Sequence, residues 1–149
     1  MYKKIVIAVD GSEPSAKALE HGLTLAKALD AKAIAVTVTD PSLFIAPGAE
    51  MMQMNTGAVV EELDKAKAEG ARQVLDHARS EARQIGLEIE GVHVPNKQTA
   101  DGILEMSAER GADLIVMGSH GRRGLGRLLL GSQAAEVLAH SPIPVLIVK

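Results

Sequence analysis

The sequence predicts an α/β fold, a five-stranded parallel sheet with helices on both faces. Apolar runs rich in β-branched residues alternate with amphipathic helical periods along the whole chain, a pattern typical of parallel sheets joined by crossover helices. Most of these apolar runs are continuous, as in strands covered on both faces. The 149 residues amount to one domain. We therefore expect residues 1–149 to form a single-domain, three-layer sandwich.

The strands are predicted where the apolar runs fall. The segment 87–94, LEIEGVHV, differs from the others because its polar and apolar residues alternate. Alternation indicates one solvated face and hence a position at or near a sheet edge. The five predicted strands are 4–9, 33–38, 87–94, 114–117 and 145–148.

Helices are predicted between the strands, because the apolar residues of these segments recur at helical spacing. Ser12 is a candidate N-cap for the first helix. Gly86 stands where glycine is favoured after the second helix. In that helix, the apolar stripe from Val60 and Leu63 to Ile85 is expected to face the sheet. The predicted helices are 13–29, 59–85, 99–110 and 132–140.

Composition excludes several classes of protein. Aromatic residues make up 1% of the chain and the net charge is −3, whereas nucleic-acid readers need aromatic platforms or a basic surface. The lack of cysteine excludes a secreted disulfide scaffold. The apolar stretch in MYKKIVIAVDGS is too short for a signal peptide or a membrane span. We expect a cytoplasmic protein that contacts neither nucleic acid nor membrane.

A glycine-rich segment between two predicted elements is the first candidate site. Residues 118–131, GSHGRRGLGRLLLG, hold five of the fourteen glycines and three arginines, without an acidic residue. The segment joins a strand to the helix at Ser132, and open parallel sheets bind ligands at the carboxyl ends of strands. A helix amino terminus offers N–H groups and a positive dipole to phosphate. Gly131 and Ser132 are thus a candidate phosphate site; the alternative is a flexible connection whose arginines keep it soluble.

Asp10 is the second candidate, because it follows the first strand at the same edge of the sheet. A carboxylate there can accept hydrogen bonds from ribose hydroxyls, as acidic residues do in other nucleotide-binding folds. The alternative is a local role, in which Asp10 starts an Asp-Gly turn. The residues alone leave both roles open.

These features resemble the universal stress protein family over the whole chain. The resemblance rests on VDGS near the amino end, on GADLIVMGSHGRRGLGRLLLGS, and on the closing SPIPVLIVK. The nucleotide-binding branch of that family has the spacing G-x2-G-x9-G-[ST], which Gly118, Gly121, Gly131 and Ser132 match. The resemblance implies a Rossmann-like fold of the adenine nucleotide alpha hydrolase-like type.

The resemblance also implies a site for ATP, or for AMP or ADP. Asp10 would hold the ribose beside Val9, and the backbone of Val38 would read the adenine edge. Mg²⁺ would be held by the phosphates, with no cluster of protein ligands. The family further implies a homodimer that pairs through the last strand. The implied nucleotide-binding residues are Val9, Asp10, Val38, Met117, Gly118, Gly121, Gly131, Ser132 and Gln133.

The function implied is a nucleotide-dependent stress-response module and not an enzyme. A triad of Ser119, His120 and Asp10 is disfavoured, because the serine and histidine are neighbours and no G-x-S-x-G elbow is present. Three variants stay open: a sensor that signals to a partner protein, a dimeric scaffold with static nucleotide, and a slow ATP hydrolase assisted by His120 or an arginine. The segment 41–57, with three of the six methionines, is either a mobile loop or an apolar lid or partner surface.

Overall fold

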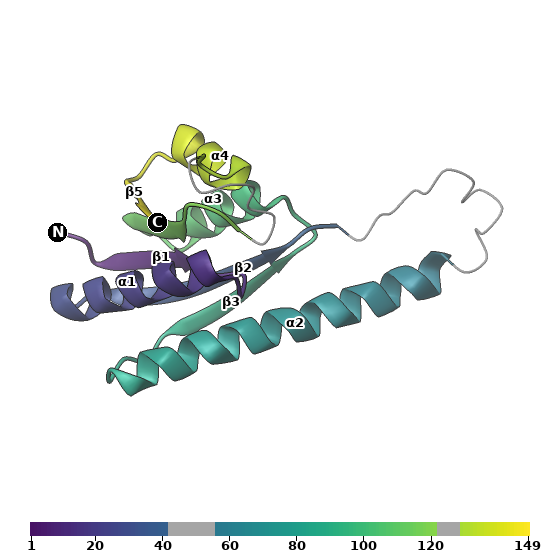
Figure 1. The fold of residues 1–149 in the computed structure, drawn as a ribbon, viewed down its shortest axis with the longest axis horizontal. Helices are drawn as coiled ribbons and strands as arrows, with labels where there is room; N and C mark the ends of the chain where they lie inside the picture. Colours follow the sequence, from purple (N-terminus) through teal and green to yellow (C-terminus); the bar gives the residue numbers. More distant parts are fainter. Residues whose placement is uncertain (42–55, 122–128) are drawn as a thin grey trace.

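The computed structural model describes residues 1–41, 56–121 and 129–149 and confirms the predicted α/β fold (Figure 1). The sheet is parallel throughout, with the strand order β3-β2-β1-β4-β5. Its strands are β1 (Lys4–Ala8), β2 (Lys32–Thr39), β3 (Glu90–Pro95), β4 (Leu114–Gly118) and β5 (Val145–Val148). The helices are α1 (Glu13–Leu29), α2 (Thr56–Gln84), α3 (Thr99–Glu109) and α4 (Ser132–His140).

Two apolar cores lie on the two faces of the sheet. The core under α1 and α2 contains Ile5, Ile7 and Leu23, and the core under α3 and α4 contains Val6 and Ile103. Successive residues of β1 enter different cores because side chains alternate across a strand. Burial on both faces is therefore the physical reason for the continuous apolar runs of the sequence.

The helix ends follow the predicted local chemistry. The Ser12 side chain accepts a hydrogen bond from the Ser15 N–H at 3.3 Å, which confirms the predicted N-cap of α1. Gly86, which follows α2, has a φ of 80°. This left-handed conformation is the one that glycine adopts without strain after a helix.

The amino-terminal part of α2 extends past the sheet (Figure 1). Ala71, Leu75 and Ala78, in the carboxyl-terminal half, are buried. Val59 and Leu63, by contrast, are 55% and 43% exposed. The expectation that Leu63 faces the sheet is wrong, because the helix period predicts which face is apolar and not how far the sheet reaches.

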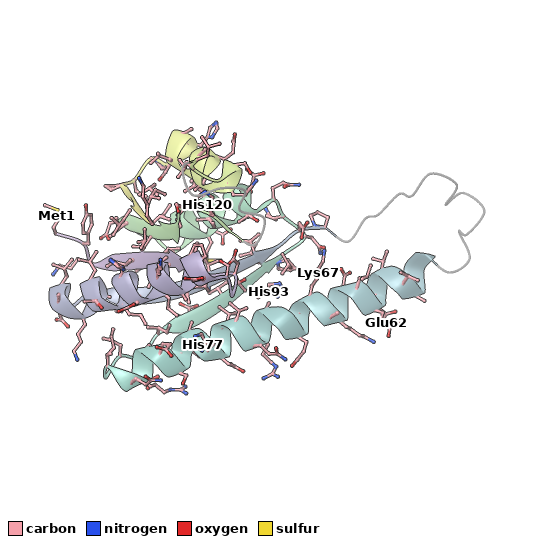
Figure 2. All side chains as sticks on the ribbon, viewed as in Figure 1. Met1, Glu62, Lys67, His77, His93 and His120 are labelled. Atoms are coloured by element: carbon pink, nitrogen blue, oxygen red, sulfur yellow. The ribbon has the colours of Figure 1, made fainter. Side chains whose placement is uncertain are left out.

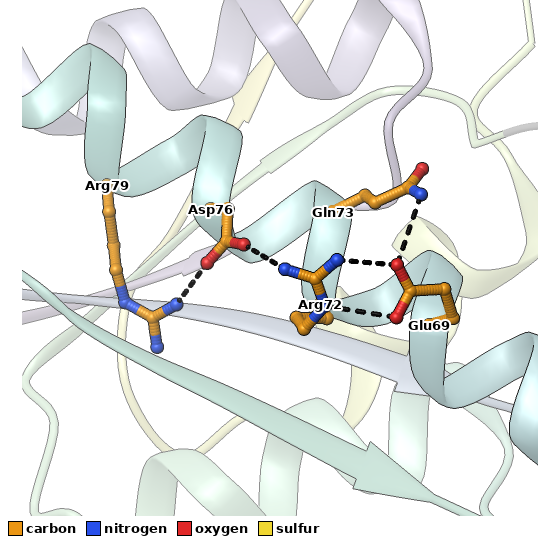
Figure 3. A network of polar contacts seen from close by, with 5 residues as sticks. All are labelled: Glu69, Arg72, Gln73, Asp76 and Arg79. Carbon is orange, nitrogen blue, oxygen red and sulfur yellow. Dashed lines mark hydrogen bonds and ion pairs between the residues drawn. The ribbon is translucent and has the colours of Figure 1, made fainter.

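A chain of ion pairs lies along the exposed side of α2 (Figure 3). Arg72 contacts Glu69 at 2.5 Å and Asp76 at 2.8 Å, and Asp76 also contacts Arg79 at 3.1 Å. The hydrogen bond from Arg72 lowers the pKa of Glu69. Glu69, Arg72 and Asp76 are exposed and Arg79 is half-buried. Water and salt therefore screen the pairs, which support the helix locally and add little to the fold.

The strand β3 lies at one edge of the sheet, as the alternation predicts. It begins at Glu90 and not at residue 87. Leu87 and Ile89 instead pack against the core under α1 and α2 before strand pairing starts. The apolar residues of the segment thus have two roles: those before residue 90 pack on the core, and those after it belong to the strand.

The strand β5 lies at the other edge, although it reads as a continuous apolar run. The carbonyl of Pro144 accepts a hydrogen bond from Ile115 of β4, and that of Val148 accepts one from Ser119, which follows β4. The intervening residues Val145 and Ile147 therefore turn their N–H and C=O groups to the open edge. Leu146 is 38% exposed on the same strand. An open apolar edge of this kind is a template for pairing with another chain.

Candidate functional site

The strand order reverses between β1 and β4, which lie side by side at the centre of the sheet. From β1 the chain proceeds outward to β2 and β3, and from β4 it proceeds outward to β5. Connections leave such neighbouring strands in opposite directions and open a crevice at their carboxyl ends. The predicted site residues all follow or end strands at this edge, or begin α4.

Asp10 follows β1 and organises the turn into α1. Its Oδ1 accepts hydrogen bonds from both the N–H, at 2.9 Å, and the hydroxyl of Ser12. The Asp10 N–H donates to the Ser15 hydroxyl at 2.9 Å. The local turn role of Asp10 is thus present. Its Oδ2 points toward the chain after β4, because a Cβ built on Gly121 would lie 2.8 Å from it.

Val38 presents backbone groups to the crevice. The last bond between the first two strands runs from the Val9 N–H to the Val36 C=O, at 2.8 Å. Because backbone groups alternate along a strand, Val38 turns its N–H and C=O to the same side as Val36. There they lie beyond the end of β1. One donor and one acceptor therefore stand side by side at the site.

The side chains of the remaining strand residues lie on different faces. Met117 and Val38 belong to the core under α3 and α4, whereas Val9 belongs to the core under α1 and α2. At this site Val9 therefore has only its backbone to offer. Packing also explains why residue 118 is a glycine, because a Cβ there would lie 2.9 Å from the backbone of Pro14 in α1.

The amino terminus of α4 begins at a glycine, which has no side chain that could cap the helix. Its N-cap residue is Gly131, and among the described residues no side chain caps the helix. Gly131 itself is tightly enclosed: its N–H donates to the Ser119 carbonyl at 2.7 Å, and a Cβ on it would lie 2.9 Å from that oxygen. The N–H groups of Ser132 and Gln133 belong to the first turn, where a helix has no internal acceptors. The arrangement is suited to bind an anion.

Two residues of α3 at the site escaped sequence analysis. Gly102 is buried, and a Cβ on it would lie 2.7 Å from both Cγ atoms of Val38. The Ala100 N–H donates to the Gln133 side chain at 2.9 Å. A glycine inside a predicted helix is a signal of close packing and could have pointed to Gly102. The bond between Ala100 and Gln133 has no signature in the sequence.

A pocket of about 320 Å³ opens at the same edge but on the opposite face, between α1 and α2. Its walls include the turn after β1 and Gln73, Val74 and His77 of α2. Of the predicted site residues, Val9 alone lines it. Since Met117 packs on the other face of the sheet, this pocket is separate from the predicted nucleotide site.

Ser119 and His120 form a pair next to the start of α4. The Ser119 hydroxyl lies 3.0 Å from His120 Nδ1, and His120 Nε2 is buried without a partner among the described residues. Figure 2 shows His120 on the α3 and α4 side, apart from His77. Within residues 1–41, 56–121 and 129–149, no three histidine or acidic side chains gather as a metal site.

Parts of the predicted features lie outside the described residues. These are the loop arginines Arg122, Arg123 and Arg127, and residues 42–55 of the methionine-rich segment. Among the helices that are described, none combines the length and the apolar character that crossing a membrane requires.

The fold and the edge site together define an open α/β protein in which a helix amino terminus lies at the topological switch point of the sheet. Residues 1–149 match the universal stress protein family, and the chain belongs to that family. The spacing of Gly118, Gly121, Gly131 and Ser132 that suggested the family lies in this part of the molecule.

Known relatives match the chain over its full length. The universal stress protein MJ0531 of Methanocaldococcus jannaschii is 38% identical over 154 residues, covering 100% of this chain and 83% of that protein. The solved structure of MJ0577 from the same organism has a TM-score of 0.82 at 29% identity and covers 100% of this chain and 96% of its own. A universal stress protein solved in complex with cAMP has a TM-score of 0.73 at 28% identity, covering 99% and 97%.

Proposed function

We propose that this protein binds ATP, or a related adenine nucleotide, at the carboxyl edge of its sheet and acts as a dimeric, nucleotide-dependent stress-response module. The observation that carries the proposal is the start of α4 at Gly131 and Ser132, which no described side chain caps and which lies beside the ends of β1 and β4. The relative that was solved with cAMP supports an adenine nucleotide as the ligand.

The phosphates would lie at the amino terminus of α4, held by the N–H groups of Ser132 and Gln133. The tight enclosure of Gly131 against the Ser119 carbonyl leaves room there for backbone alone. Mg²⁺ would be bound by the phosphates, since no group of three acidic or histidine side chains in the described parts of the chain offers a site.

The adenine and ribose would occupy the other half of the crevice. The paired N–H and C=O of Val38 match the acceptor and donor on the edge of adenine, and Met117 offers an apolar wall. Asp10 would accept hydrogen bonds from the ribose hydroxyls. The base would thus be recognised without aromatic stacking, in a chain whose single tyrosine and single phenylalanine are at positions 2 and 44.

Ligand-dependent stability tests the proposal directly. Added ATP with Mg²⁺ should raise the thermal midpoint, and ATP at a hundred times its Kd stabilises by about 2.7 kcal/mol. Mass spectrometry of the denatured protein identifies any nucleotide that co-purified. If neither carried-over nor added adenine nucleotide changes the midpoint, the proposal fails.

Replacing Asp10 with asparagine should weaken ATP binding about fivefold, because the ribose loses a charged acceptor. Stability should change little, since asparagine retains an oxygen that can accept the two bonds from Ser12. Titration calorimetry with ATP and with free adenine separates the effects. Equal weakening for both ligands would contradict a role for Asp10 at the ribose.

We also propose that the dimer forms through the open edge of β5. Val145→Pro removes an N–H that points to this edge, without removing a bond to β4. We expect at least tenfold weaker dimerisation, as measured by light scattering over a concentration series. Val145→Ala keeps the N–H and serves as the control; a dimer that survives Val145→Pro must use another surface.

Slow hydrolysis of ATP is the second candidate, favoured by the buried Nε2 of His120 beside Ser119 and the start of α4. An imidazole there could accept a proton from an attacking water. His120→Gln should then abolish phosphate release while retaining ATP affinity.

If the wild-type protein releases no phosphate, the rate of nucleotide exchange decides between the two other roles. A sensor exchanges its bound nucleotide with nucleotide in solution, whereas a scaffold with static nucleotide does not.

A further inference from the structure

The helices α1, α3 and α4 begin near the site and differ in whether, and by which residue, they are capped. α1 is capped by its own Ser12, and α4 has no side-chain cap among the described residues. The N-cap residue of α3 is Gln98, whose side chain makes no capping bond. The Oε1 of Gln133 takes over this role by accepting the bond from the Ala100 N–H at 2.9 Å. One helix of the site therefore caps another.

The capped helix also reaches the other end of the site. Gly102 lies two residues beyond Ala100, and it packs so closely on β2 that a Cβ would come within 2.7 Å of both Cγ atoms of Val38. Ala100 is 5% exposed, and Val38 packs in the same core. A displacement of the first turn of α3 would therefore shift Val38 as well, since close-packed contacts transmit small movements.

We propose that Gln133 is a positioning residue that couples the phosphate end of the site to the base end. Its backbone N–H is in the first turn of α4, and its side chain fixes the first turn of α3. α3 in turn packs through Gly102 on the side chain of Val38, whose N–H and C=O face the crevice. The inference rests on the proposed nucleotide site and adds a residue that acts on the base from the phosphate side.

Adenosine is the probe that isolates this coupling, because it has no phosphate to contact α4. Gln133→Ala should weaken adenosine binding by about threefold to tenfold, as expected for the loss of one helix cap. Gln133→Glu retains an acceptor oxygen and should bind adenosine within about twofold of the wild type. Gln98→Ala is the matched control: it removes a glutamine side chain from the same helix end, where that side chain caps nothing.

Amide hydrogen exchange supplies a second readout that needs no ligand. Exchange at Ala100 should be faster in Gln133→Ala than in Gln133→Glu or Gln98→Ala. Unchanged adenosine affinity in Gln133→Ala, with normal binding by the wild type, overturns the inference and leaves the proposed function intact. If the wild type binds neither adenosine nor ATP, the proposed function fails, and the coupling fails with it. A lower melting temperature without a change in adenosine affinity means that Gln133 is only structural.

Discussion

Replacing Ser132 with proline is expected to weaken ATP binding at least tenfold while α4 remains folded. The substitution removes one N–H from the proposed phosphate site, and a hydrogen bond to a charged group contributes about 1.5–3 kcal/mol. Proline is tolerated at the first position of a helix, where the N–H has no internal partner. Gly131, which precedes it, already has φ −58° and ψ 150°, the conformation that a residue before proline prefers.

The control for this variant is Ser132→Ala, which removes the hydroxyl and keeps the N–H. We expect its affinity to fall less than about threefold. Titration calorimetry gives both affinities, and circular dichroism checks that the helix content is unchanged. Wild-type affinity in Ser132→Pro would place the phosphates elsewhere than at the start of α4.

Replacing Gly22 with alanine should lower the free energy of unfolding by about 1–3 kcal/mol, although alanine favours helices. A Cβ at this position of α1 would lie 2.6 Å from Cδ1 and 2.7 Å from Cγ1 of Ile7. Ile7 is completely buried, so its side chain cannot move aside into solvent. Glycine at this position allows α1 to lie directly on the central strand.

The matched variant is Gly70→Ala in α2, where a Cβ meets nothing within 4 Å. The same substitution there should stabilise the protein by about 0.5–1 kcal/mol, the gain in helix propensity. Urea denaturation measures both changes. Adding Ile7→Val should relieve part of the Gly22→Ala effect; if the two changes are additive, the contact with Ile7 is not its cause.

The order and type of the elements could be predicted because each segment needs a particular pattern of burial. Strands between two helix layers need continuous apolar runs, and helices over one face need a stripe. Where β5 lies in the sheet could not be predicted, because an apolar run does not distinguish a central strand from an edge strand that awaits a partner. Leu63 was misplaced for a related reason: its surroundings depend on how far the sheet extends.

The candidate site was predicted unevenly. The candidate phosphate site at the start of α4 could be predicted from a glycine-rich segment between a strand and a helix. A site of this kind consists of backbone N–H groups, so its prediction does not depend on distant residues. The packing partners of Gly118 and Gly102 could not be predicted, since they are distant segments of the chain, Pro14 and Val38. The capping of α3 by Gln133 joins residues 33 positions apart, and no local rule describes it.

The strand order has a consequence for how the chain folds as it is synthesised. One edge of β1 pairs with β2, the next strand in the sequence, but its other edge pairs with β4. The Asp113 side chain that accepts a bond from the Lys3 N–H lies 110 residues further along. Until that segment emerges from the ribosome, one edge of this apolar central strand has no pairing partner, which makes the chain prone to aggregation.

The proposed nucleotide site lies where β1 and β4 meet, and this pairing cannot form until β4 has been synthesised. Asp10 and Val38 belong to the half of the chain that is synthesised first. Met117 and Ser132 belong to the later half, whose strand β4 pairs with β1. Nascent or truncated chains that end before α4 should therefore not be retained on immobilised ATP. Nucleotide binding in the cell would mark the molecules whose folding is complete.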